Sequence, residues 1–462
     1  MAREHSTIRP KVLGLISLGC PKNTVDSERL LGELAMRGWA FTDDIDEAQC
    51  LIVNTCGFIE DARLESEEAL EEICEVKRER PEVILVATGC LPQRQGSDLG
   101  GIFPEIDLIV GVGSLPELPQ LLESLWEGDS PQVAHRPDLL APGRSTLSIA
   151  TDPRLRLTPD WMAYLKIAEG CGHECSFCII PAIKGPHVSR PMDDIVEEAR
   201  YLASDGVREL ILISQDTTAY GSDIGASLRS LLEKLDDVDG ISWIRLHYLY
   251  PSKISPGLLD FIADSTHVIP YFDIPLQHVQ PGVLKRMNRL APDIDPFEIV
   301  TKIRSRFQDS RMPACIRSTF IVGFPGETDG DAAALLDFVE NARLDRLTVF
   351  QFSPENGTPA AVLPDQVPEA IAEARMHQLM EAQHDISFEI NRGWVGKTID
   401  VLLEGETDDG RMVGRSYRDA PEIDGLVIVD KVPESIEYGE IIKARVAGAL
   451  PYDLEAEWER LP

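Results

Sequence analysis

Long apolar runs are missing from this chain of 462 residues. No stretch approaches the roughly 18 consecutive apolar residues that a membrane-spanning helix needs. The first residues read MAREHST and lack the apolar core of a signal peptide. We therefore expect a cytoplasmic protein with no membrane partner.

Positive charge is also scarce. Lys and Arg number 44 against 78 Asp and Glu, which gives a formal net charge of −34. Such a charge disfavours nonspecific binding to nucleic acid or to an anionic membrane and favours a basic partner. A generally acidic surface could still coexist with local RNA binding, so charge alone does not decide the substrate.

Cysteines are few, and their number, nine, is odd. They are spread over a chain long enough for roughly two to four domains, without the dense, even spacing of a disulfide framework. Metal binding or catalysis in a reducing compartment explains them better than cross-linking does.

Three of the cysteines lie within one short segment, which reads GCGHECSFCIIP. It places Cys171, Cys175 and Cys178 at spacings of four and three. Three thiolates suit an iron-sulfur cluster and leave one iron open to a substrate or cofactor. Two alternatives remain: half of a zinc site, for which His173 would have to turn onto the same metal, or a dithiol redox pair.

Strand-like runs and helical patterns alternate near the start of the chain, at 12–18, 26–37, 51–53, 60–80 and 83–87. This alternation predicts a parallel sheet covered on both faces, with ligands at the carboxyl edge. Cys20, Cys56 and Cys90 each follow one of the three strand-like runs, so all three fall on that edge. They are either a second metal site or small buried side chains. The remaining cysteines are predicted to be buried apolar residues: Cys50, Cys74 and Cys315.

A proline-rich stretch at 128–160 predicts a linker. Beyond it, strand candidates recur at 164–168, 209–214, 243–247, 271–274, 317–322 and 347–352, with helical patterns such as 192–204 and 330–342 between them. Six strand-helix units predict an incomplete (β/α)6 barrel with its chemistry at the carboxyl ends of the strands. The three-cysteine segment directly follows the first of these strands.

After a helical stretch at 368–391, short strands at 398–403, 411–416, 425–429 and 440–449 predict a small β-barrel. From 393 to 462 there are 8 Lys plus Arg and 16 Asp plus Glu. That balance has the wrong sign for binding phosphate, so we expect the barrel to meet a basic protein. We place the domains at 11–127, 157–390 and 393–462.

Several polar residues stand where the central strands are predicted to end and could line a cavity or serve only as structural residues and turns. They are Gln215, Asp216, His247, Gln277, His278, Arg317 and the turn at 323–327.

The cysteine segment, with Phe177 before its last cysteine, resembles the radical S-adenosylmethionine (SAM) enzymes. The segments LGCPKNTVDSE and VNTCGFI, which contain Cys20 and Cys56, look like the amino-terminal domain of the methylthiotransferases within that group, and the terminal barrel resembles the TRAM domain, an RNA-binding module.

This resemblance implies two 4Fe-4S clusters, each with one open iron. Cluster 1 would be held by Cys20, Cys56 and Cys90, and cluster 2, which chelates S-adenosyl-L-methionine, by Cys171, Cys175 and Cys178. The expected SAM contacts are Phe177, Gln215, Arg317 and Gly323. One departure is Lys184, where relatives commonly carry arginine; lysine keeps the charge but lacks the planar fork of a bidentate contact.

The segments ISQDTTAYG, DIPLQH and DAPEIDG are similar to the branch of the family that modifies an aspartate of ribosomal protein S-twelve. The tRNA branch usually reads GCQMN where this chain has GCPKN. The resemblance implies methylthiolation of the aspartate β-carbon, within the free protein or the small ribosomal subunit, with electrons from a flavodoxin or ferredoxin. Because no ordinary side-chain acid or base breaks an unactivated C–H bond, a radical is required. A tRNA (adenosine) methylthiotransferase and a cluster protein that senses iron or redox state are the alternatives.

Overall fold

The structure is a computed structural model that describes residues 11–96, 98–128, 153–289 and 294–460. The chain forms two compact units. The first takes in the described residues up to Leu157 together with Glu169–His173 and Ile179–Val188. The second takes in Thr158–Ala168, Glu174–Cys178 and the described residues from Ser189 onward. Most of the predicted linker, 129–152, lies outside the described residues.

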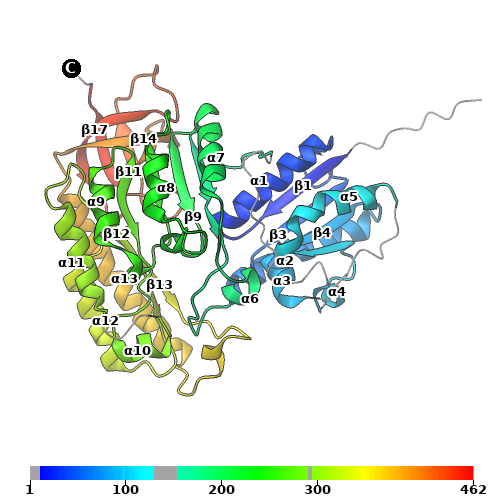
Figure 1. Ribbon diagram of the computed structural model, residues 1–462, viewed down its shortest axis with the longest axis horizontal. Coiled ribbons are helices and arrows are strands. Elements are labelled where there is room, and N and C mark those ends of the chain that lie inside the picture. Colours follow the sequence, from blue (N-terminus) through cyan, green and yellow to red (C-terminus); the bar gives the residue numbers. More distant parts are fainter. Residues whose placement is uncertain (1–10, 97, 129–152, 290–293, 461–462) are drawn as a thin grey trace, which may run out of the picture. The chain divides into compact units, whose positions relative to one another are not determined.

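The first unit is built on a five-stranded sheet in which all strands are parallel (Figure 1). Its order is β2 (Ala40–Phe41), β1 (Val12–Ser17), β3 (Cys50–Thr55), β4 (Ile84–Gly89) and β5 (Leu108–Gly111). The predicted parallel sheet is therefore confirmed. The two outer strands, β2 and β5, were not predicted, because runs this short carry too little periodicity to be recognised.

Helices cover both faces of this sheet. They are α1 (Pro21–Met36), α2 (Glu60–Glu79), α3 (Cys90–Gln95), α4 (Asp98–Ile102), the 3-10 helix η1 (Val112–Glu117), α5 (Leu118–Trp126) and α6 (Ile180–Lys184). One core contains Leu34 of α1 and Leu122 of α5, and the other contains Leu70 of α2. Cys50 lies in the first core and Cys74 in the second, both fully buried, as predicted.

The second unit contains a six-stranded parallel sheet. Its order is β13 (Arg346–Gln351), β12 (Cys315–Val322), β11 (Val268–Asp273), β10 (Trp243–Leu246), β9 (Glu209–Ile213) and β6 (Met162–Lys166). The main helices are α7 (Met192–Ser204), α8 (Leu228–Leu235), α9 (Pro256–Asp264), α10 (Pro281–Arg286), α11 (Pro296–Phe307), α12 (Asp329–Ala342) and α13 (Glu369–Arg392). The shorter elements of this unit are η4 (Thr217–Ala219), η5 (Pro251–Lys253) and η6 (Pro359–Val362), while β7 (Ala168–Glu169) and β8 (Val188–Ser189) form a separate two-stranded sheet. The predicted incomplete (β/α)6 barrel is confirmed.

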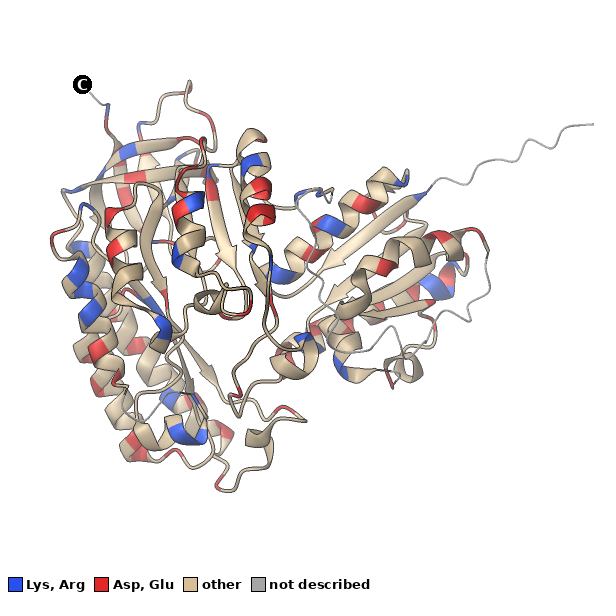
Figure 2. Cartoon of the chain, viewed as in Figure 1, with Lys and Arg blue, Asp and Glu red and all other residues tan. Residues whose placement is uncertain are grey.

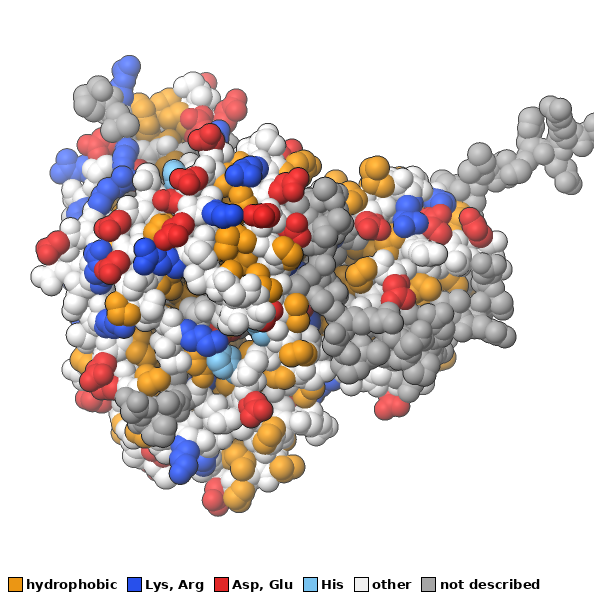
Figure 3. Space-filling view, in the orientation of Figure 1, with side chains coloured by type: hydrophobic (Ala, Val, Ile, Leu, Met, Phe, Trp, Pro, Cys, Tyr) orange, Lys and Arg blue, Asp and Glu red, His pale blue; other side chains and the backbone are white. Residues whose placement is uncertain are grey.

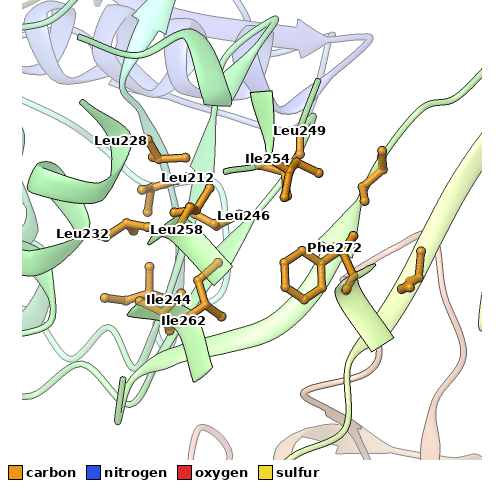
Figure 4. Close-up of a cluster of buried hydrophobic side chains, with 14 of the residues drawn as sticks. Leu212, Leu228, Leu232, Ile244, Leu246, Leu249, Ile254, Leu258, Ile262 and Phe272 are labelled. Atoms are coloured by element: carbon orange, nitrogen blue, oxygen red, sulfur yellow. The ribbon is translucent and has the colours of Figure 1, made fainter. Parts of the chain in front are cut away.

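One face of the six-stranded sheet is apolar and packs against the helices. Figure 4 shows Leu212 and Leu246 of the strands among side chains of α8 and α9, and Phe272 of β11 packs against Phe307 of α11. Alternate residues of a strand point to opposite faces, so the residues between these, such as Arg245, point to the other face. In Figure 2 the strands are mostly tan, while most charged residues lie on helices and loops.

The terminal barrel packs on that other face, near the amino ends of the strands. It is closed and consists of β14 (Thr398–Glu406), β15 (Met412–Ser416), β16 (Val427–Asp430), β18 (Leu454–Trp458) and β17 (Ile441–Ala449). Tyr417 and Leu402 of the barrel region join Trp243, Tyr271 and Cys315 of the sheet in one apolar cluster. The small β-barrel is therefore confirmed, and Cys315 is buried as predicted.

Buried ion pairs accompany this apolar contact. Glu209 of the sheet lies between Arg245 and Arg415, at 2.7 Å from each, and all three side chains are almost fully buried. Arg346 pairs with Asp419 at 2.5 Å. These pairs fix the barrel on the sheet, because separating the two would leave buried charges without partners.

Charged side chains of both signs are interspersed on the face of the second unit that Figure 3 shows. Among the helices that the structure describes, none has the length and hydropathy needed to cross a bilayer.

Candidate functional site

Cys20, Cys56 and Cys90 lie where β1, β3 and β4 end, at the carboxyl edge of the first sheet. Gly19 has φ +94°, and a Cβ there would lie 3.0 Å from the Cβ of Cys56 and 3.4 Å from its Sγ. A side chain at Gly19 would therefore collide with Cys56, which explains the glycine before the first cysteine. The structure brings these cysteines together, as the predicted edge position requires.

Asn23 connects the three strand ends. Its Nδ2 donates hydrogen bonds of 3.0 Å to the carbonyl oxygens of Leu18 and Thr55, and its Oδ1 lies 3.9 Å from Cys90 Sγ. Sequence reasoning gave Asn23 no role. The signal was present, because Asn23 is the last residue of the GCPKN motif and lies in the first turn of α1, which begins at Pro21.

Lys184 lies in a buried charge cluster of the first unit. Its Nζ is 3.5 Å from Asp26 Oδ2 and 3.6 Å from Glu169 Oε1, and all three side chains are at most 4% exposed. Burial lowers the pKa of Lys184, but the charges of Glu169, Cys90 and Asp26 outweigh it and hold that pKa well above its ordinary value. Lys184 therefore remains a fixed positive charge near Cys90.

Of the three thiols at this edge, Cys90 is buried, and Cys20 and Cys56 are partly exposed. Burial raises the pKa of Cys90 to about 12, opposed by Lys184, and burial also raises the pKa of Cys56. Without a metal, the Cys56 and Cys90 thiols would be neutral at pH 7, whereas a bound metal would deprotonate them. The three sulfur donors, with a cation near them, suit an anionic iron-sulfur cluster.

The second cysteine set occupies the loop between β7 and α6. Cys171 belongs to the first unit, where its N–H donates to Gly185 O at 3.1 Å and its Sγ accepts from the His173 N–H at 3.5 Å. Cys175 and Cys178 belong to the second unit, where the Cys178 N–H donates to Cys175 O at 3.0 Å.

Over the described ranges, no three His, Cys, Asp or Glu side chains are arranged around a single metal ion. A 4Fe-4S cluster takes each cysteine on a different iron, so its ligands do not have to converge on one point. The three cysteines at the strand ends of the first unit offer three thiolates, which fits such a cluster with one iron left open.

Phe177 and Gly323 lie in the same part of the second unit. Phe177 packs against a buried cluster that includes Met287 and Phe324. Gly323 has φ +74°, and a Cβ there would lie 2.5 Å from the Cβ of Ala372 on α13. Only glycine fits both the backbone and the close approach of the helix.

The turn that follows Gly323 is held from several sides. Arg286 donates to Pro325 O at 3.0 Å and to Gly326 O at 2.8 Å. Glu327 accepts from the Phe324 N–H at 3.0 Å, and Arg375 binds the other oxygen of Glu327 at 3.1 Å. These contacts hold the turn in one conformation at the carboxyl end of β12.

Arg317 departs from its predicted position. It is the third residue of β12 rather than a residue past its end. Its guanidinium donates to Thr348 Oγ1 at 2.7 Å and pairs with Asp273 at 3.3 Å and Asp424 at 3.5 Å. The strand predicted at 317–322 already began with Arg317, and the structure extends it back to Cys315, so this residue lies inside the strand.

Other predicted residues do stand past strand ends. Gln215 lies two residues after β9, and Asp216 caps η4 and pairs with Lys253 at 3.0 Å. His247 directly follows β10, and His278 follows β11. Burial lowers the pKa of His278 to about 4, so this ring is neutral at pH 7.

Comparison with protein families matches three parts of the chain. Residues 13–111 match the model described as "Uncharacterized protein family UPF0004", residues 165–339 match "Radical SAM superfamily", and residues 395–458 match "TRAM domain". A solved structure of the radical S-adenosylmethionine methyltransferase TsrM from Kitasatospora setae, with cobalamin and a [4Fe-4S] cluster bound, has a TM-score of 0.55 at 15% identity and covers 87% of this chain and 82% of its own. This likeness shows the shared fold.

The fold and the three matched regions thus define a radical SAM protein with a TRAM domain. A protein of Geotalea uraniireducens is 43% identical over 456 residues, covering 98% of this chain and 99% of the relative. One from Thermoanaerobacter sp. is 42% identical, covering 97% and 100%. Both carry the name ribosomal protein uS12 methylthiotransferase RimO. The present chain belongs to this RimO family.

Proposed function

We propose that this protein transfers a methylthio group to the β-carbon of an aspartate of ribosomal protein uS12, the S-twelve protein of the small ribosomal subunit. The observation that carries the proposal is identity above 40% over nearly the whole length to relatives of that name. The same likeness favours this substrate over the adenosine of a tRNA, since these relatives are named for the protein substrate.

The proposal includes two 4Fe-4S clusters and SAM. Cys20, Cys56 and Cys90 would hold cluster 1, and the set at 171, 175 and 178 would hold cluster 2. When bound, cluster 2 supplies the electron that cleaves SAM into a hydrogen-abstracting radical, and cluster 1 supplies a site for the sulfur to be transferred.

The protein's own residues would place these groups. Asn23 ties together the strand ends that carry the first three cysteines, and Lys184 provides positive charge near Cys90. Phe177 and Gly323 would form part of the SAM site, with Gln215 beyond the end of β9. Arg317 is a weaker candidate for SAM, because its guanidinium is engaged by Asp273, Asp424 and Thr348.

The partners follow from the charge of the chain. A net charge of −34 suits a basic ribosomal protein, and a flavodoxin or ferredoxin would deliver the electrons. The protein would act in the cytoplasm, where ribosomes are found. We propose domains at 11–127, 157–390 and 393–462, with the TRAM barrel used for protein contact; contact with RNA would be an additional property.

The deciding experiment supplies reconstituted, reduced enzyme with SAM and sulfide. One reaction receives uS12 or small subunits, and another receives bulk tRNA. We expect a mass gain of about 46 units, the replacement of hydrogen by methylthio, on one aspartate of uS12 and none on tRNA nucleosides. Methylthiolated adenosine with unmodified uS12 would contradict the proposal. If the protein holds its clusters but does not cleave SAM, that result would instead support a function as a sensor of iron or redox state.

A further inference from the structure

Arg289 lies directly beside one cysteine of the cluster 2 set. Its Nη1 donates a hydrogen bond to Cys175 Sγ, with 3.7 Å between the two atoms. Arg289 is 8% exposed and Cys175 is 7% exposed, so the contact is shielded from water. Sequence reasoning gave this arginine no role.

The guanidinium of Arg289 is held in one orientation. Its Nη2 donates to Pro275 O at 2.6 Å. Its Cζ lies 4.3 Å from the centroid of the Tyr250 ring, and the Tyr250 hydroxyl donates to the Arg289 carbonyl oxygen. A planar fork that is stacked and hydrogen-bonded loses most of its rotational freedom, so Nη1 stays directed at the sulfur.

The backbones that carry the two residues are also joined. The Ser176 N–H donates to Met287 O at 2.9 Å, and Ser176 Oγ donates to Arg286 O at 2.7 Å. Asn288 Nδ2 donates to Glu174 O at 2.8 Å. Three hydrogen bonds therefore fix the cysteine segment against the segment that ends in Arg289.

The positive charge of Arg289 has no carboxylate to balance it in the described part of the chain. Other buried arginines do have one: Arg190 pairs with Glu198, and both Arg245 and Arg415 pair with Glu209. A buried charge is stable only when it is compensated. Arg289 does contact the sulfur of Cys175, which becomes negative when it binds metal and can then compensate this charge.

We propose that Arg289 is a positioning residue of cluster 2, donating a hydrogen bond to the Cys175 thiolate and balancing the charge of the bound cluster. Hydrogen bonds to the sulfurs and nearby positive charge stabilise the more negative, reduced state of a cluster. Arg289 therefore raises the reduction potential and eases the entry of the electron. This inference rests on the proposed function only in requiring a cluster at Cys175.

The test compares the variants Arg289→Gln, Arg289→Lys and Arg306→Gln in reconstituted full-length protein. Arg306 is the matched control, because it carries the same charge in the same unit but pairs with Asp260 at 2.6 Å on the surface. The midpoint potential of the cluster whose EPR signal responds to SAM is measured by redox titration, along with iron content, without uS12.

We expect Arg289→Gln to lower the ratio of reduced to oxidised cluster 2 about tenfold at a fixed solution potential. For a one-electron couple this corresponds to a midpoint potential that is lower by about 59 mV. Arg289→Lys keeps the positive charge but loses the planar guanidinium, so the midpoint potential should fall by less than in Arg289→Gln. Arg306→Gln should leave the midpoint potential unchanged. If cluster 2 fails to assemble in Arg289→Gln, assembly in Arg289→Lys supports the charge requirement.

The proposal fails if Arg289→Gln holds its full iron content with an unchanged potential, or if both Arg289 variants lose the cluster, because the lysine retains the charge. Wild-type protein without a SAM-responsive cluster would contradict the cluster assignment itself. A tRNA substrate would overturn the proposed function and leave this measurement unaffected.

Discussion

At the scale of single residues, the cysteines of the first sheet's carboxyl edge differ in surroundings from three others. Those at strand ends stand together, whereas Cys50, Cys74 and Cys315 are packed among apolar side chains. Replacing Cys20, Cys56 and Cys90 together with alanine should remove about half of roughly eight irons and leave SAM cleavage detectable. The matching replacement of Cys171, Cys175 and Cys178 should remove the other half and abolish cleavage.

Iron analysis and detection of 5′-deoxyadenosine provide the measurement. Alanine at Cys50, Cys74 or Cys315 is the control and should leave the iron unchanged. Full iron content in the first triple variant would show that the strand-end cysteines hold no cluster.

Lys184 supports a second prediction at this scale. Lys184→Met leaves Asp26 and Glu169 buried without their cation, and breaking a buried ion pair in this way costs about 3–5 kcal/mol of unfolding free energy. Urea unfolding of the metal-free protein measures the loss. Lys431→Met is the matched control, because Lys431 and its partner Glu457 are 67% and 49% exposed, and should cost less than about 1 kcal/mol. Equal losses would show that the Lys184 cluster is not stabilising.

At the scale of elements, the junction between β12 and α13 depends on one glycine. Gly323→Ala adds a Cβ at positive φ, which costs about 1–2 kcal/mol, and places it 2.5 Å from the Ala372 Cβ, which costs about 1–3 kcal/mol more. Gly396→Ala has a similar φ, +86°, with nothing within 4 Å, so it isolates the backbone cost. The melting temperature of the first variant should fall further than that of the second, and equal falls would rule out the clash.

The sequence predicted elements with strong patterns and missed those without them. The helix at 192–204 was predicted with its observed bounds, because its apolar residues recur at helical spacing. Strand β18 was not predicted, since Leu454–Trp458 carries two glutamates and only two buried residues. The contact between Arg289 and Cys175 could not be predicted, because the two residues are 114 positions apart in the sequence. It depends on long-range hydrogen bonds between their segments, and no local sequence pattern indicates these.

At the scale of the whole molecule, the ion pairs between the terminal barrel and the six-stranded sheet should stabilise the protein less at acidic pH. Arg415 and Arg245 overcome the effect of burial and lower the pKa of Glu209 to about 2. Because this pKa lies below its ordinary value, the stabilisation is present above about pH 4.5 and is lost as the pH falls towards 2. Urea unfolding of the metal-free protein at pH 7 and pH 3 should show that loss.

Glu209→Gln should destabilise the protein at pH 7 by about 3–5 kcal/mol and flatten its acid dependence. Glu457→Gln, which changes a half-exposed carboxylate, is the control and should keep the wild-type slope. An unchanged slope in Glu209→Gln would assign the acid sensitivity to other carboxylates.

The first unit is not continuous along the chain, since it includes Glu169–His173 and Ile179–Val188 in addition to the residues before Leu157. A gene fragment that stopped at residue 157 would encode Asp26 without Lys184, and Cys90 without the apolar contacts of Ile179 and Ile183. A junction at residue 157 therefore divides the unit, and a single junction that exchanges the whole unit between relatives has to lie after Val188. Any viable chimera would have to take the cysteine loop from the same parent as the sheet.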